Sequence, residues 1–174
     1  VNKDQYTVIP LQGSGTFGIE ATLTSVIPKE NEHLLIIING AYGSRMAKMC
    51  QVHGINYTTL EYAENEVPNM DELANYIKKH QSTLTHVACI HSETTSGIVN
   101  DVTSIGTLIK SIKPKLTYIV DAMSSFGGIP LSMQQASIDY LVSSSNKCIE
   151  GVPGFSFILA NKKNLDQCQG NART

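Results

Sequence analysis

The sequence predicts an α/β fold, a three-layer α/β/α sandwich built on a mostly parallel sheet. Apolar, strand-like runs alternate along the chain with helix-like stretches, which is the order of βαβ units. Several of these runs are apolar throughout, as in sheets that are covered on both faces. The 174 residues suffice for one domain with a sizeable core.

Local signals place each element in turn. Apolar runs predict strands over residues 33–39, 55–60, 85–90, 116–120, 138–142 and 154–160, with a short and weak candidate at 6–11. Helical patterns predict helices over residues 19–26, 42–53, 69–79 and 101–113. Asn69 suits an N-cap, while Gly54 and Pro114 mark helix ends. The connection before the last strand contains no clear helix, which favours an antiparallel orientation for that strand.

Composition and charge argue against several classes of partner. The net charge is −2 without runs of like charge, so neither nucleic acid nor an anionic membrane surface is the expected partner. The longest apolar run, residues 34–38, is far too short to span a bilayer. The four cysteines show no metal-ligand or Cys-x-x-Cys spacing, so we expect reduced thiols in a cytoplasmic protein and no metal site.

Polar clusters follow four of the predicted strands. In parallel sheets, ligands bind at the carboxyl ends of the strands, which meet at one edge. The sequence therefore predicts a single site formed by residues 39–42, 91–97, 121–124 and 143–147.

One of these clusters contains an aspartate, and another contains a lysine. Asp121 ends one apolar run, and Lys147 lies just beyond the next. Pyridoxal 5′-phosphate (PLP) needs such a pair, an amine for a Schiff base and an acid that keeps the pyridine nitrogen protonated. A solvated lysine and a turn-capping aspartate are the alternatives, but a carboxyl in an apolar run is costly to bury without a partner. We therefore expect Lys147 and Asp121 to be catalytic, with Lys147 also moving the substrate proton.

The run Gly13–Gly18 suits the phosphate of such a cofactor. Backbone N–H groups of Ser14, Gly15 and Thr16, together with two hydroxyls, would meet the anion at a helix N-terminus. A plain turn is one alternative. A dinucleotide site is another, disfavoured because only a weak strand candidate precedes the glycines and no acid ends the next strand.

Other polar-cluster residues allow two interpretations each. Tyr42 either stacks on the pyridine ring or belongs to the core, and Thr94 either caps its loop or hydrogen-bonds the cofactor. Arg45 suits a buried ion pair or a substrate carboxylate. Glu93 is either an acceptor that fixes its loop or exposed to solvent.

Five motifs in order carry a resemblance to a known family: Gly-Ser-Gly-Thr-Phe-Gly, Asn-Gly-Ala-Tyr-Gly-Ser-Arg, His-Ser-Glu-Thr-Thr-Ser-Gly-Ile-Val-Asn, Val-Asp-Ala-Met-Ser-Ser-Phe-Gly-Gly and Ser-Ser-Asn-Lys-Cys-Ile-Glu-Gly-Val-Pro-Gly. The set resembles the class V, fold-type I PLP-dependent aminotransferases over residues 10–162. Within that family it is most similar to the branch acting on 2-aminoethylphosphonate and pyruvate.

The resemblance implies that residues 1–174 are the PLP-binding large domain, a fragment lacking the C-terminal small domain. It implies that Lys147 forms the Schiff base and that Asp121 contacts the pyridine nitrogen. Further implied cofactor contacts are Ser14, Gly15, Thr16, Tyr42, Thr94, Met123 and Asn146.

The implied partners are a small-molecule amino donor, a 2-oxo acid acceptor and a second subunit of a homodimer. The implied reaction passes the amino group of 2-aminoethylphosphonate to pyruvate and gives phosphonoacetaldehyde and L-alanine. Alternatives are an alanine–glyoxylate or serine-type class V aminotransferase, and a truncated, inactive remnant.

Overall fold

The computed structural model describes residues 2–173, so the expected domain, 1–174, extends one residue beyond it at each end. Its helices are α1 (Gly15–Val26), α2 (Ala41–Val52), α3 (Met70–Lys79), α4 (Val102–Ile112) and α5 (Lys162–Asp166). Its strands are β1 (Tyr6–Gln12), β2 (Leu34–Ile38), β3 (Tyr57–Glu61), β4 (His86–Ile90), β5 (Ser92–Glu93), β6 (Ile98–Val99), β7 (Thr117–Asp121), β8 (Tyr140–Ser144) and β9 (Phe155–Asn161).

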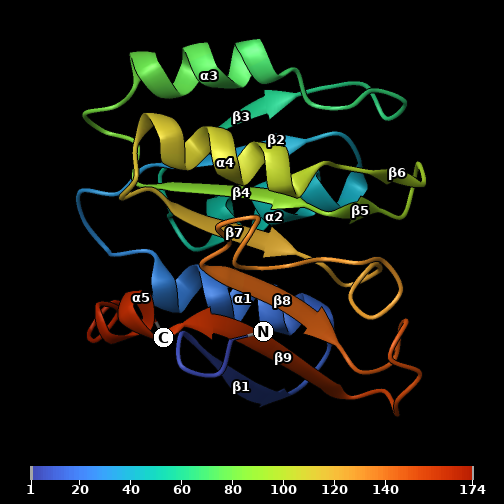
Figure 1. Cartoon of the computed structure of the whole chain (residues 1–174). Coiled ribbons are helices and arrows are strands. Elements are labelled where there is room, and N and C mark those ends of the chain that lie inside the picture. Colours follow the sequence, from blue (N-terminus) through green and yellow to red (C-terminus); the bar gives the residue numbers. More distant parts are fainter. Residues whose placement is uncertain (1, 174) are drawn as a thin grey trace.

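The large sheet organises the molecule. Within residues 2–173 it has seven strands in the order β1-β9-β8-β7-β4-β2-β3, and Figure 1 shows it edge to edge. Strands β3, β2, β4, β7 and β8 are parallel, whereas β9 runs antiparallel to both β8 and β1. The antiparallel orientation expected for the last strand is thus confirmed, and so is the mostly parallel sheet.

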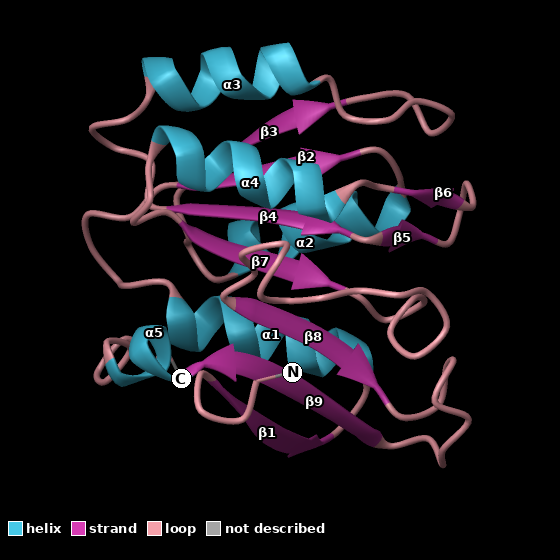
Figure 2. Ribbon diagram, viewed as in Figure 1, coloured by secondary structure: helices cyan, strands magenta, loops and turns pink. Residues whose placement is uncertain are grey.

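Helices cover both faces of this sheet. Helices α3 and α4 lie in front of it and α1 and α2 behind it in the view of Figure 2. One apolar cluster joins α3 and α4 to the sheet, for example through Ile77, Ile109 and Val87. A second joins α1 and α2 to the other face through Leu23, Met46 and Ile36. Because both faces are buried, β2, β4 and β8 show no exposed position, which is why their sequences do not alternate.

Three local features differ from the prediction. Helix α1 begins at Gly15 rather than at residue 19, because Ser14 caps it and accepts a hydrogen bond from the N–H of Phe17. The loop over residues 91–97 contains β5, which pairs with β6 in a short hairpin. Helix α5 follows β9 directly, with Asn161 as its N-cap. Glycines and short polar stretches hide such features from apolar periodicity.

Of the helices formed by the described residues, none combines the length and apolar character required to cross a bilayer. Within the same part of the chain, His, Cys, Asp and Glu side chains form no group of three or more that could hold a metal ion.

Candidate active site

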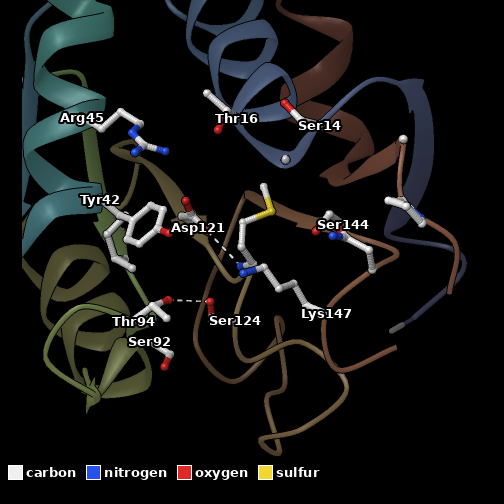
Figure 3. A pocket seen from close by; sticks show the side chains of 16 residues that line it. Ser14, Thr16, Tyr42, Arg45, Ser92, Thr94, Asp121, Ser124, Ser144 and Lys147 are labelled. Carbon is white, nitrogen blue, oxygen red and sulfur yellow. Dashed lines mark hydrogen bonds between the residues drawn. The ribbon is translucent and has the colours of Figure 1, made fainter. Parts of the chain in front are cut away.

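A cleft of about 290 Å³ opens at the carboxyl ends of the parallel strands. Its walls come from the first turns of α1 and α2, the ends of β4 and β7, and the loops after β7 and β8 (Figure 3). The structure brings all nine sequence-predicted site residues to this cleft: Ser14, Gly15, Thr16, Tyr42, Thr94, Asp121, Met123, Asn146 and Lys147. Their individual roles toward a cofactor stay a prediction.

Asp121 lies at the floor of the cleft as the last residue of β7. It is only 6% exposed, and its carboxylate accepts a hydrogen bond from the N–H of Met123 at 2.9 Å. Burial raises the pKa of Asp121 from 3.8 to about 6, the Met123 hydrogen bond opposes this, the charge of Glu93 raises the pKa further and that of Lys147 lowers it. The positive charge and hydrogen bonding around Asp121 therefore do not offset the cost of burying its charged form.

Lys147 approaches the same space from a tight turn after β8. The N–H of Gly151 donates to the carbonyl of Ser145 at 2.7 Å, and the N–H of Glu150 donates to the carbonyl of Lys147 at 2.9 Å. The hydroxyl of Ser145 ties the turn to β9 by donating to the carbonyl of Phe155 at 3.1 Å. Figure 3 shows Lys147 and Asp121 facing one cleft, with Asp121 at the end of β7 and Lys147 in the turn that follows the adjacent strand β8.

The N-terminus of α1 forms the wall opposite the Lys147 turn. Ser14 Oγ accepts from the N–H of Phe17 at 3.3 Å, while the N–H groups of Gly15 and Thr16 occupy the first turn, where helices have no internal acceptors. Any Cβ on Gly15 would overlap the Met123 thioether, with its methyl carbon only 2.8 Å away. The absence of a side chain at Gly15 thus leaves Met123 the space it occupies beside the first turn of α1, whose free amides suit an anion.

The glycines of this segment do not form a dinucleotide-binding unit. Strand β1 is an edge strand paired antiparallel with β9, and α1 leads to β2, which lies on the far side of the sheet. A dinucleotide fingerprint needs a βαβ unit with parallel strands. That alternative for Gly13–Gly18 is therefore wrong.

Helix α2 contributes an aromatic and a cationic side chain. Tyr42 is half-buried in the cleft wall, and the guanidinium carbon of Arg45 lies 5.0 Å from the centroid of its ring. This arrangement is a cation–π contact. Arg45 is exposed, so the buried ion pair considered for it from the sequence is wrong, and its charge is directed along the cleft toward Thr16 (Figure 3).

Further residues line the cleft beyond the nine predicted ones. The hydroxyl of Ser124 lies 2.6 Å from that of Thr94, a hydrogen bond that joins the loops after β4 and β7 (Figure 3). Ser124 was within the predicted polar cluster and was identifiable. Pro153 and Gly154 also line the cleft, but they precede an antiparallel strand, so the rule for carboxyl ends does not select them.

The sequence model of the family described as aminotransferase class V matches residues 1–171. The chain belongs to this family. The resemblance found in its motifs is therefore confirmed, and the cleft described above belongs to a class V aminotransferase chain.

Among similar class V proteins are two curated 2-aminoethylphosphonate–pyruvate transaminases. That of Phocaeicola vulgatus is 47% identical over 171 residues, which cover 98% of this chain and 46% of the relative. That of Vibrio cholerae is 44% identical over 169 residues, covering 97% and 45%. The chain thus spans about half the length of these relatives. The solved pyridoxamine–pyruvate aminotransferase of Mesorhizobium loti has a TM-score of 0.87 at 26% identity, covering 95% of this chain and 41% of that one.

Proposed function

We propose that this chain is the cofactor-binding large domain of a PLP-dependent aminotransferase that moves the amino group of 2-aminoethylphosphonate to pyruvate. The observation that carries the reaction class is the presence of Asp121 and Lys147 in one cleft with the N-terminus of α1. The names of relatives that are 44–47% identical support the substrate pair.

The residues fit the proposed cofactor in three respects. The carboxyl of Asp121 is buried with a raised pKa, so a cationic partner such as a protonated pyridine nitrogen would stabilise its charged form. The open amides and hydroxyls of Ser14 and Thr16 suit a phosphate. Tyr42 presents an aromatic wall of the kind that packs against a planar ring.

When bound, PLP supplies an aldehyde for a covalent link to an amine and a ring that withdraws electrons from the substrate carbon. Asp121 would accept the hydrogen bond from the ring nitrogen and keep it protonated. Lys147 would supply the amine for the link at Nζ. Once that amine is displaced by the substrate, the same nitrogen would take the proton from the substrate carbon and return it.

The walls would orient and enclose the reacting groups. Thr94 and Ser124, fixed to one another by their hydrogen bond, would offer hydroxyls near the link to Lys147. Asn146 and Met123 would fill the sides of the cleft and exclude water. We further propose that a second domain completes the enzyme, because the chain spans about half of its relatives' length. A second subunit is proposed as well, as the resemblance to the family implies.

The test is covalent labelling of the full-length protein. After incubation with PLP and reduction with borohydride, we expect a cofactor adduct on the peptide that contains Lys147, and none in Lys147→Ala. Asp121→Asn should retain the adduct but lose most of the transamination rate. Amino-donor assays then separate the substrate alternatives, with 2-aminoethylphosphonate and serine each offered pyruvate or glyoxylate as acceptor, and alanine offered glyoxylate. An adduct absent from the wild-type peptide, or equally abundant in Lys147→Ala, contradicts the proposal.

A further inference from the structure

Helix α2 begins without a capping side chain of its own. Its N-cap is Gly40, which has no side chain to accept from the first-turn amides. Unpaired amides at a buried helix start cost free energy and leave the first turn free to fray. This turn carries Tyr42, with Arg45 one turn beyond, so its position sets one wall of the cleft.

The missing cap is supplied from another part of the chain, by Glu93 at the end of β5. The Glu93 carboxylate accepts from the N–H of Tyr42 at 3.2 Å and from that of Gly43 at 3.4 Å. Thr95 completes the arrangement, since its hydroxyl donates to Glu93 at 3.0 Å and accepts from the N–H of Ala41 at 3.3 Å. Glu93 is 0% exposed, and a buried carboxylate of this kind persists only where donors surround it. Of the two sequence interpretations of Glu93, the loop-fixing acceptor is the one observed.

Gly40 and Glu93 fit each other sterically. A Cβ added to Gly40 would overlap the Glu93 side chain, with a carboxylate oxygen 2.8 Å away and two carbons closer still. The backbone of Gly40 is extended, with φ 170°, a conformation open to any residue. The glycine is therefore required for the space it leaves, and that space is filled by the carboxylate that caps α2.

We propose that Glu93 is a positioning residue: by capping α2 from the neighbouring loop, it fixes Tyr42 and Arg45 against the cofactor. The inference rests on the proposed function, because it assigns the Tyr42 wall to the PLP ring. The same hairpin carries Thr94, so one buried carboxylate couples the aromatic wall of the cleft to the loop with the hydroxyl pair. The influence of the Glu93 charge on the pKa of Asp121 further indicates that this carboxylate lies close to the cleft floor.

The experiment compares two helix caps in the full-length protein. Glu93→Gln weakens the cap of α2, and Asn69→Ala removes the cap of α3, where Asn69 accepts from the N–H groups of Asp71 and Glu72 at 3.0 Å. Helix α3 contributes no residue to the cleft, so Asn69→Ala is a matched control for lost stability alone. The readouts are amide hydrogen exchange at Tyr42 in the cofactor-free protein and the dissociation constant for PLP.

We expect Glu93→Gln to speed exchange at the Tyr42 amide and to weaken PLP binding by roughly tenfold. Asn69→Ala should leave both unchanged. Glu93→Gln should also add little to Tyr42→Ala in a double-mutant cycle, because Glu93 acts through Tyr42. If Glu93→Gln binds PLP with wild-type affinity, or if its effect is fully additive with that of Tyr42→Ala, the role of Glu93 is overturned and the proposed function is left standing. A wild-type protein that binds no PLP overturns the proposed function together with it.

A second pair of variants keeps the test decisive if Glu93→Gln folds poorly. Gly40→Ala leaves Glu93 intact but displaces its carboxylate, so it should weaken PLP binding to a similar extent. In a Glu93→Ala background the overlap is gone, and Gly40→Ala should then have no further effect on PLP binding and should no longer lower the melting temperature. A Gly40→Ala effect that is equally large in both backgrounds overturns the inference.

Discussion

Asp121→Asn is expected to stabilise the cofactor-free protein at neutral pH while impairing the enzyme. The pKa of Asp121 is raised from 3.8 to about 6, chiefly by burial, so the folded state holds this proton more tightly than the unfolded chain does. The stability contributed by the protonated carboxyl is fully present below pH 3.8 and is lost as the pH rises through 6. At pH 8 the gap between the two pKa values corresponds to about 3 kcal/mol. Asparagine avoids this loss and keeps an acceptor for the Met123 N–H.

The assay is urea unfolding of the cofactor-free protein at pH 3.5 and pH 8. We expect the two proteins to differ little at pH 3.5, below the unfolded pKa, and the variant to gain up to about 3 kcal/mol at pH 8. The matched control is Asp139→Asn: Asp139 is also 6% exposed, but it is paired with Lys110 at 2.7 Å and accepts from the N–H of Tyr118 at 2.8 Å. Breaking this pair should destabilise the protein at pH 8, by about 3 kcal/mol. An Asp121→Asn variant less stable than wild type at pH 8, or equally stabilised at both pH values, would refute the reasoning.

Three further substitutions test the packing and the α1 cap. Gly106→Ala should destabilise the protein by more than about 1 kcal/mol in thermal melts, because the added Cβ would overlap the backbone carbonyl of Ala136. Alanine has the better helix propensity, so a gain in stability would contradict the observed contact. Ile109→Ala removes a fully buried side chain of α4 and should cost about 2–5 kcal/mol in urea unfolding, with no change if that face of the sheet were solvated. Ser14→Ala should cost about 1 kcal/mol through the lost N-cap and also raise the dissociation constant for PLP; an unchanged constant would argue against a phosphate site there.

The sequence predicts those parts of the fold that depend on continuous apolar runs. Strands such as β2 and β4 are buried on both faces and contain few polar residues, so the sequence predicts both within one or two residues of their observed bounds. The gathering of Asp121 and Lys147 at one edge also follows from the sequence, because parallel strands place their carboxyl ends together. The apolar runs and the order of the segments along the chain therefore predict much of the architecture and the position of the cleft.

The remainder depends on contacts between segments far apart in sequence. At Gly40, nothing nearby in the sequence indicates that Glu93 fills the adjacent space. The sequence predicts the start of the first helix at residue 19, whereas α1 begins at Gly15. Glycine has low helix propensity, but packing against the sheet outweighs it: a Cβ on Gly18 would lie 3.1 Å from side-chain atoms of Ser156 and Val142. Such tertiary contacts leave no periodic signal in the sequence.

The pairing of β1 with β9 has a consequence for how the chain matures on the ribosome. Tyr6 opposes Asn161, and among the described residues β9 is the strand to which β1 bonds. At ordinary elongation rates, the partner emerges roughly 8–30 seconds after β1 has been translated. Throughout that interval, the residues of β1 cannot complete their backbone hydrogen bonds with β9. Its apolar side chains, Tyr6, Val8, Ile9 and Leu11, therefore stay available to chaperones and to other nascent chains until β9 emerges, and Val8 is 57% exposed even in the finished fold.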